Sequence, residues 1–224
     1  MLPKFCIYCG RLESFVCVRC QGLFYEKSGF IAAKGLDNCL VGFVYNKALE
    51  YAIKQIKYAG YYRIAGQLAG ILVEAHAAQV NDLLNDAIVI PVPLAREKLQ
   101  SRGFNQAELL AREILASINS QQSNPAARQP HILAPIIKRV SHTTTQVGKN
   151  KDWRRRNLSA AFQIDFEVQI PLPAGQNLPR KALLIDDIYT SGITLEICAD
   201  ILRSNGFEQV NGLVLASAKK TIGY

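Results

Sequence analysis

Short apolar runs alternate with segments of helical hydrophobic spacing along most of the chain. In the segment 47–58, Leu49, Ala52, Ile53 and Ile56 recur at the spacing that places them on one face of a helix. By the same criteria, helices are predicted at 47–58, 62–78, 105–117 and 193–204, and strands at 39–46, 87–90, 131–137, 160–166, 182–185 and 210–216. Polar, proline-containing stretches at 120–130 and 171–179 are predicted to be surface loops.

The alternation of strands and helices predicts the fold class. Strands separated by helices form a parallel sheet with helices on both faces, so we expect an open α/β sheet. The length of 224 residues and the hydrophobic share of 49% suit one such domain with a small appendage. No apolar run approaches the roughly 18 residues of a membrane helix. The first residues lack the features of a secretory signal, so a cytoplasmic protein is expected.

Four of the six cysteines lie close together near the start of the chain. Cys6, Cys9, Cys17 and Cys20 form two CxxC pairs separated by seven residues. Two residues between thiolates let both sulfurs of a tight turn reach one ion, and two such turns complete a closed, structural zinc site. The alternatives are disulfides, which the expected cytoplasmic location disfavours, and a redox pair, which fits two adjacent motifs less well.

The cysteine pattern also predicts how the chain is divided into domains. We expect a zinc-binding module at 1–36 and an α/β domain at 37–224. A segment of about 35 residues cannot bury a sufficient core of its own, so metal binding would supply its folding energy. Cys39 and Cys198 stand apart in apolar surroundings, and we expect them to be buried thiols rather than metal ligands.

The positive charge of the chain is concentrated in one segment. Residues 138–158 hold seven cations against the single acid Asp152, a surplus of six within a formal net charge of +8. A run of this kind is either a solvated surface or a site for a polyanion, and charge alone does not separate phosphate, pyrophosphate and nucleic acid. The seven cations are Lys138, Arg139, Lys149, Lys151, Arg154, Arg155 and Arg156.

The segment 182–194, with the sequence ALLIDDIYTSGIT, carries the candidate chemistry. A buried strand is predicted to end at Asp186 and Asp187, after which the turn 190–192 opens a helix. Ligands of open α/β sheets bind at this end of the strands, and a helix N-terminus suits a phosphate. A phosphate on the helix and carboxylates just upstream would span a ribose 5-phosphate. The structural alternative is that Asp187 caps the turn and Thr190 caps the helix.

This segment resembles the signature of type I phosphoribosyltransferases, which binds 5-phosphoribosyl-1-pyrophosphate (PRPP). Tyr189 departs from the pattern, because many members carry an aliphatic residue there. The resemblance implies that Asp186 and Asp187 are the catalytic pair, which holds the ribose directly or through Mg²⁺. The implied PRPP-binding residues are Asp186, Asp187, Thr190, Ser191, Gly192, Ile193 and Thr194.

Two further segments agree with this resemblance. The segment 89–111 places a Pro-Val-Pro-Leu loop after a strand and continues with the string RGFNQ at 102–106. The basic segment 138–162 resembles the flexible loop that closes over the reaction and excludes water from it. The implied pyrophosphate and loop residues are Val92, Pro93, Arg96, Arg102, Lys149, Arg154 and Arg155.

Together with the four-cysteine knuckle, this order of motifs resembles the ComF family of competence-associated, phosphoribosyltransferase-like proteins. The resemblance covers nearly the full length of the chain. It implies a type I phosphoribosyltransferase-like fold and, for the competence members of the family, a role in natural DNA uptake alongside other DNA-uptake proteins. It supplies no acceptor substrate for a transfer reaction.

Three functions remain open at the level of the sequence. The first is an enzyme that transfers a phosphoribosyl group from Mg²⁺-PRPP to an unidentified nucleophile and releases pyrophosphate. The second is a module that binds single-stranded DNA through Trp153 and the arginines 154–156, although Trp153 is equally consistent with a partly buried core aromatic. The third is a PRPP-sensing regulator without chemistry. Release of pyrophosphate separates the first function from the other two.

Overall fold

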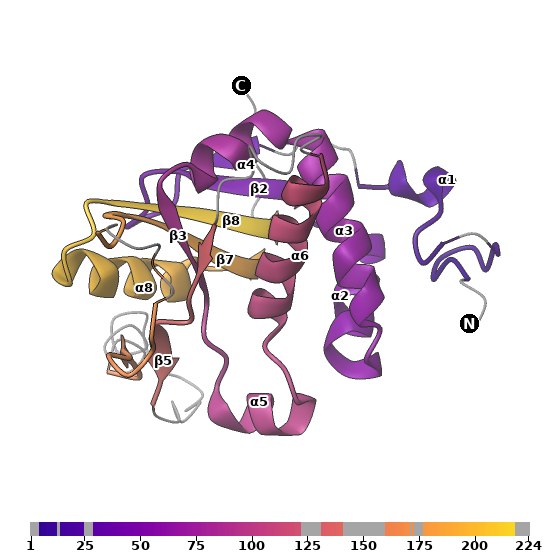
Figure 1. The fold of residues 1–224 in the computed structure, drawn as a ribbon. Helices are drawn as coiled ribbons and strands as arrows, with labels where there is room; N and C mark the ends of the chain where they lie inside the picture. Colours follow the sequence, from indigo (N-terminus) through magenta and orange to yellow (C-terminus); the bar gives the residue numbers. More distant parts are fainter. Residues whose placement is uncertain are drawn as a thin grey trace.

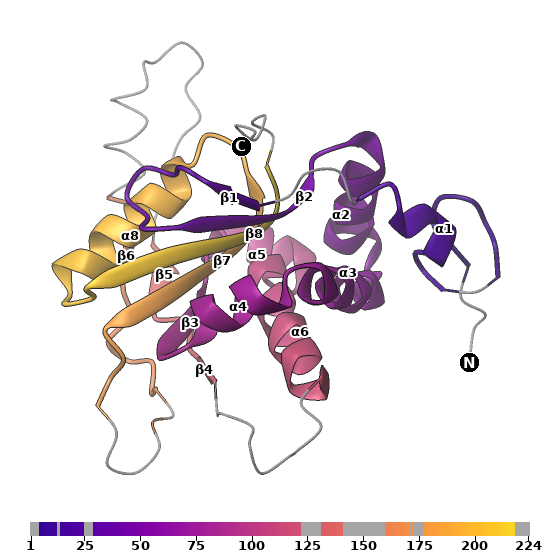
Figure 2. The ribbon, with the colours of Figure 1, turned by 90° about the horizontal axis from the view of Figure 1, so that it is seen from above.

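A six-stranded sheet forms the centre of the protein (Figures 1 and 2). The computed structural model describes residues 5–12, 14–24, 29–121, 131–140, 160–170, 172 and 177–217. In spatial order the strands are β1 (Gly29–Ile31), β2 (Cys39–Val44), β8 (Gln209–Ser217), β7 (Lys181–Tyr189), β3 (Ala87–Pro91) and β4 (Ile132–Leu133). β1 is antiparallel to β2, and the other neighbouring strands are parallel. The predicted fold class, a parallel-dominated sheet flanked by helices, is confirmed.

Helices cover both faces of this sheet. α8 lies on one face, and α3, α4 and α6 lie on the other (Figure 2). A separate antiparallel pair, β5 (Ile137–Arg139) and β6 (Phe162–Ile164), packs near α8. The helices are α1 (Val18–Gln21), α2 (Lys47–Ala59), α3 (Tyr62–Ala75), α4 (Ala77–Leu84), α5 (Arg96–Arg102), α6 (Gln106–Gln121) and α8 (Ile193–Ser204). In the part of the chain that the structure describes, no helix has the length and apolar character needed to cross a membrane.

The central strand β7 shows why its sequence is a continuous apolar run. Leu183 and Ile185 pack into the core on the side of α3 and α6, whereas Ala182 and Leu184 pack into the core on the side of α8. Successive side chains of a strand point to opposite faces, so a strand covered on both faces is apolar at every position. This burial fixes the register of β7 and therefore the place of the acids that follow Ile185.

The helix α2 begins and ends where its sequence signals predict. Asn46 precedes the first residue, and its side-chain oxygen accepts a hydrogen bond from the amide of Leu49 at 2.8 Å. Gly60 follows the last residue in the left-handed conformation, with φ of 70°, which stops the helix. Helix α8 matches its predicted bounds of 193–204.

Two helices differ from the sequence prediction. The predicted helix 62–78 is two helices, because α3 ends at Ala75 and α4 starts at Ala77. His76 lies between them, and its ring nitrogen Nε2 is 3.2 Å from the carbonyl oxygen of Gly42. α5 is not among the predicted helices. It buries none of its residues, so it has no apolar face for the periodicity to reveal.

Two predicted strands also change. The predicted strand 131–137 is divided between β4 in the main sheet and β5 in the separate pair, with Pro135 between them. The predicted strand 182–185 is longer, because β7 continues through both acids to Tyr189. Pairing with β8 extends to the register of Tyr189 with Ser217, which keeps the acidic segment extended.

The cysteine segment docks on the outer side of α2 and α3, away from the sheet (Figure 1). The Tyr8 hydroxyl donates to the carbonyl of Ala48. The side chain of Gln67 accepts from the amide of Val16 at 2.8 Å and donates to its carbonyl at 2.6 Å. The strand β1, which follows this segment, belongs to the main sheet. The predicted domain boundary between residues 36 and 37 stays a prediction.

We expect Gln67→Ala to loosen the docking of the cysteine segment. The substitution removes both hydrogen bonds to Val16, and each bond of this kind contributes about 1 kcal/mol to stability. The free energy of unfolding, measured by urea denaturation, should fall by about 1–3 kcal/mol. Gln79→Ala changes the exposed Gln79 of α4 and is the matched control. Equal stability of the two variants would show that the docking does not depend on Gln67.

Candidate functional site

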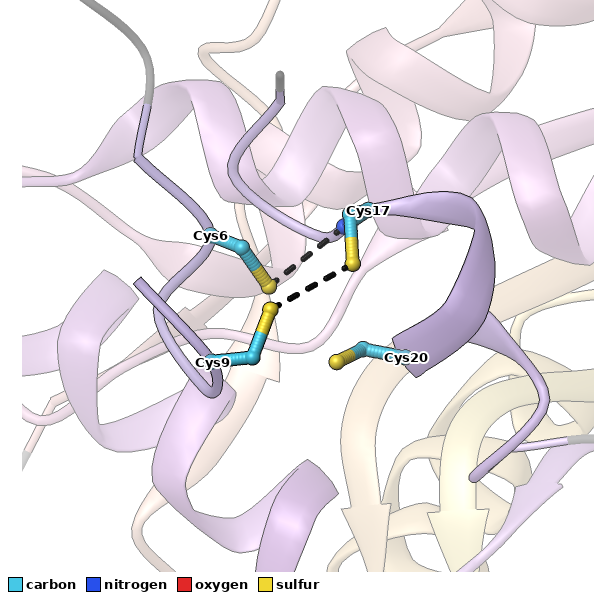
Figure 3. A group of neighbouring side chains, drawn as sticks. All are labelled: Cys6, Cys9, Cys17 and Cys20. Atoms are coloured by element: carbon cyan, nitrogen blue, oxygen red, sulfur yellow. Dashed lines mark hydrogen bonds between the residues drawn. The ribbon is translucent and has the colours of Figure 1, made fainter. Parts of the chain in front are cut away.

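The four predicted metal ligands lie together at the N-terminal end of the structure (Figure 3). Their sulfur atoms all lie within 4.8 Å of one another, and the sulfurs of Cys9 and Cys17 are 3.6 Å apart. In a tetrahedral zinc site with Zn–S bonds of about 2.3 Å, the sulfurs are separated by about 3.8 Å. All six cysteines are free thiols. The cluster is therefore compatible with a structural zinc site, and Cys39 and Cys198 are buried outside it, as predicted.

Backbone groups around the cluster favour thiolate at one position. Burial raises the pKa of Cys6, but backbone hydrogen bonds, first among them the one from Cys17, outweigh it and lower the pKa to about 6. Burial, aided by the neighbouring thiols, raises the pKa of Cys20 to about 12. Gly10, with φ of 70°, turns its amide back to the carbonyl of Cys6 at 2.9 Å, which closes the first CxxC turn. Zinc would bind all four sulfurs as thiolates and displace their protons.

A second site lies where β3 and β7 end side by side. The chain leaves β3 toward β4 at one edge of the sheet and leaves β7 toward β8 in the opposite direction. Ligands of open α/β sheets bind outside the carboxyl ends of the strands at this change of direction. The amide of Val92 donates to the carbonyl of Ile185 at 2.9 Å, so the turn that contains Val92 and Pro93 lies beside the acid pair. The fold thus brings two of the sequence-predicted segments together.

The two acids of β7 have different surroundings. Asp187 is buried and forms an ion pair with Lys57, which extends from the last turn of α2 and keeps only 19% of its side chain exposed. Asp186 is partly exposed, and its Oδ1 accepts from the amide of Asp187 at 2.8 Å. Burial, followed by the charge of Asp187, raises the pKa of Asp186 well above its usual value. Asp187 is therefore a salt-bridged carboxylate. Asp186 is an acid whose charged form a cation or a hydroxyl donor would stabilise.

The turn after β7 has the geometry of an anion site. Thr190 and Ser191 are exposed, and α8 begins at Ile193, so its first amides point toward the turn. Gly192 has φ of 81°, and a Cβ atom there would lie 2.3 Å from the hydroxyl oxygen of Tyr189. The turn can therefore accept no larger residue at this position without rearrangement. The amide of Ile193 donates to Ser191 Oγ at 3.4 Å.

The string RGFNQ at 102–106 holds the turn after β3. Gly103, with φ of 81°, ends α5. The side-chain amide of Asn105 donates to the carbonyl of Val92 at 3.0 Å, and its oxygen accepts from the amide of Ala107 at 3.0 Å. Arg102 donates to the buried Gln106. The string thus links α5, α6 and the turn that faces the acids.

The cationic residues that the sequence predicts for the site differ in their contacts. Arg96 is exposed at the start of α5, and the guanidinium of Arg102 lies over the ring of Tyr58, 5.4 Å from its centre. Within the basic segment, Lys138 pairs with Asp165 at 3.1 Å and Arg139 stacks on Phe162. These two cations therefore have structural partners. Lys149, Arg154 and Arg155, like Trp153 and Arg156, lie outside the described residues.

Lys57 belongs to the candidate site, and the sequence prediction missed it. It follows Ile53 and Ile56 in an amphipathic helix, where a polar residue predicts nothing beyond solvent contact. The relevant signal is its position in the last turn of α2, and this becomes meaningful only when the tertiary fold places that turn against β7.

Comparison with known proteins finds relatives that are named for competence and for DNA utilization. The chain is 28% identical over 217 residues to competence protein F of Haemophilus influenzae, covering 96% of this chain and 85% of that protein. It is 30% identical over 164 residues to DNA utilization protein YhgH of Escherichia coli O157:H7, covering 72% of this chain and 64% of YhgH. Competence protein ComFC of Bacillus subtilis is 23% identical over 166 residues, covering 73% of this chain and 57% of ComFC.

The two remaining comparisons add little. No family model matches the chain. A hypoxanthine phosphoribosyltransferase from Staphylococcus aureus aligns with 70% of this chain and 64% of its own, with a TM-score of 0.35 and 15% identity. A likeness at this level supports no conclusion by itself, so the fold is assigned from the strand order and pairing of this chain.

We expect the cysteine cluster to bind about one zinc ion per chain in protein purified without added metal, measured by elemental analysis. Cys17→Ser should lower both the zinc content and the solubility, because a serine oxygen is a poor replacement for a thiolate. Cys198→Ser removes a buried thiol outside the cluster and should retain the zinc. A fully folded N-terminal segment without metal would contradict the assignment.

Proposed function

The chain belongs to the ComF family, and from that premise we propose that it binds Mg²⁺-PRPP at the carboxyl ends of β3 and β7. It transfers the phosphoribosyl group to a nucleophile and releases pyrophosphate, in a competence or DNA-uptake role. The observation that carries this proposal is the acid pair of β7, followed at once by the turn at Gly192 and the start of α8, with the turn after β3 alongside.

The turn 190–194 is suited to the 5-phosphate of PRPP. Its backbone amides and the exposed hydroxyls of Thr190 and Ser191 are donors, and the N-terminus of α8 adds a favourable dipole. Gly192 allows the phosphate to approach the backbone closely. Ile193 and Thr194 contribute the first amides of the helix. The phosphate therefore fixes one end of the substrate.

The acids would hold the ribose at the other side of the turn. Their carboxylate oxygens suit the ribose hydroxyls or Mg²⁺, which prefers oxygen ligands. A bound Mg²⁺ would neutralise charge on the pyrophosphate. Lys57 orients Asp187 through their ion pair. Within the described part of the chain, Asp186 has no lysine partner of this kind, and a ribose hydroxyl or a cation would stabilise its charged form.

The pyrophosphate end of PRPP would lie over the turn after β3. The backbone at Val92 and Pro93 is held beside Ile185 and fixed by Asn105. Arg96 and Arg102 lie on the short helix that follows this turn and supply positive charge near the leaving group. The assignment of Lys149, Arg154 and Arg155 to the closing loop stays a prediction from the sequence.

We expect the double variant Thr190→Ala/Ser191→Ala to bind PRPP more weakly while the fold is retained. Each lost hydrogen bond to a charged group is worth about 1.5–3 kcal/mol, which corresponds to more than a tenfold loss of affinity for each contact. Isothermal titration calorimetry in excess Mg²⁺ measures the change. Ser204→Ala, at the opposite end of α8, is the control. Wild-type protein without measurable PRPP affinity would refute the proposal.

Asp186→Asn separates binding from stability. The variant should bind PRPP more weakly, because it loses an acceptor for ribose or a ligand for Mg²⁺. Its melting temperature near neutral pH should equal or exceed that of the wild type, since a carboxyl group with a raised pKa costs folding free energy when it is charged. A melting temperature well below that of the wild type would show that the Asp186 charge stabilises the fold.

A second candidate function is favoured by the names of the relatives, competence protein F and DNA utilization protein. In this alternative the protein binds single-stranded DNA without chemistry. Residues 138–158 hold seven cations, and five of them remain for phosphate contacts when Lys138 and Arg139, which have structural partners, are set aside, so the affinity should fall steeply as salt rises.

The triple variant Arg154→Ala/Arg155→Ala/Arg156→Ala should flatten the salt dependence of DNA binding by up to about three phosphate contacts. Fluorescence anisotropy with a labelled oligonucleotide measures the slope. Lys138→Ala is the control, because Lys138 already has an acidic partner. An unchanged slope, or no DNA affinity in the wild type, would argue against this role. Release of pyrophosphate on addition of PRPP and an acceptor would distinguish the enzyme from both a DNA-binding module and a PRPP sensor.

A further inference from the structure

A pocket of about 440 Å³ lies between the junction of α2 with α3 and the short helix α5. None of its aromatic residues belongs to the sequence motifs discussed above except Phe104, which sits in the RGFNQ string. The pocket is lined by Lys57, Tyr58, Gly60, Tyr62, Lys98, Ser101, Arg102 and Phe104.

The lining combines cations with aromatic rings. Lys98 and Arg102 provide two positive charges, and Lys57 adds a third that is already paired with Asp187. The guanidinium of Arg102 lies over the Tyr58 ring at 5.4 Å, and the rings of Tyr62 and Phe104 meet at right angles, with centres 4.8 Å apart. Tyr58 is nevertheless 78% exposed and Tyr62 is 48% exposed. Exposed ring faces beside cations can be covered by a planar, negatively charged molecule.

Lys57 joins this pocket to the acid pair. Its ammonium group pairs with Asp187 at the end of β7, and the same side chain lines the pocket. A molecule in the pocket would therefore lie next to the ribose of bound PRPP. Pyrophosphate alone would be attracted by the cations, but it has no planar face and would leave the rings exposed.

We propose that this pocket binds the acceptor, and that the acceptor is a planar aromatic molecule with an anionic substituent, either carboxylate or phosphate. This inference rests on the proposed function, because it supplies the nucleophile for that reaction. A nitrogen of the acceptor forms a bond to C1 of the ribose. The bond from C1 to the pyrophosphate oxygen breaks, its electron pair leaves with pyrophosphate, and the proton from the nitrogen passes to water.

The first test compares two probes that differ in planarity. We choose 2-naphthoate and its saturated counterpart, decahydro-2-naphthoate, titrated into wild-type protein without PRPP. The two carry the same charge, and the saturated ring is at least as apolar, so tighter binding of 2-naphthoate reports contact with the ring faces. We expect 2-naphthoate to bind at least about fivefold more tightly. Equal affinities would overturn the proposal.

The second test compares variants of the pocket with matched controls. Tyr58→Ala and Lys98→Met should each weaken 2-naphthoate binding by about five- to tenfold. Tyr61→Ala and Lys54→Met change an exposed tyrosine and an exposed lysine that do not line the pocket, and they should leave this binding within about twofold of the wild type. All four positions lie at the surface, and circular dichroism confirms that the variants are folded.

Measuring PRPP affinity on the same proteins distinguishes failure of the acceptor pocket from failure of the proposed function. The proposal is supported if the pocket variants lose 2-naphthoate binding and keep PRPP binding. If they lose both by the same factor, and inorganic pyrophosphate displaces 2-naphthoate, the pocket holds the pyrophosphate end and the proposal is wrong. If PRPP binds but 2-naphthoate does not, the acceptor pocket fails while the proposed function stands. If 2-naphthoate binds but PRPP does not, the proposed function fails and the acceptor role fails with it.

Discussion

The placement of a buried carboxylate at the end of the central strand is the constraint around which this structure is arranged. Asp187 follows the most deeply buried part of β7 and needs a cation close by. Lys57 is that cation, and it can reach Asp187 only because α2 ends beside the carboxyl edge of the sheet. Removing one partner of a buried ion pair typically costs about 3–5 kcal/mol, because the remaining charge is left unpaired. The buried Asp187 therefore depends on the position of α2, because the end of that helix supplies its cation.

A second constraint shapes the turn that follows. Tyr189 is 4% exposed, and its hydroxyl lies where a side chain at Gly192 would have to go. The tyrosine that departs from the usual aliphatic pattern thus packs beneath the turn and requires a glycine above it. Burial raises the pKa of Tyr189, so it stays a neutral phenol. The departure changes how the turn is supported and leaves the exposed hydroxyls of Thr190 and Ser191 in place.

Local sequence patterns, such as an apolar helix face or a CxxC pair, predicted the elements that contain those patterns. α2 and α8 have apolar faces, and the CxxC spacing brings two sulfurs together within a single turn. α5 buries no residue and therefore has no periodicity to detect. Lys57 could not be identified for a different reason, since its partner lies far away in the sequence and no local pattern records the contact. Asn105 belonged to a recognised string, but its bond to the Val92 carbonyl required the tertiary fold.

The cysteine segment and the acid pair share one helix. Tyr8 bonds to the carbonyl of Ala48 in the first turn of α2, and Lys57 meets Asp187 from the last turn. A helix of 13 residues spans about 20 Å and bends little over this length. The ring of Phe24, which follows the last cysteine, packs on Phe43 of β2 with centres 5.6 Å apart, so the segment also contacts the sheet. The cysteine segment, which is bonded to one end of α2, therefore helps to fix the lysine at the other end.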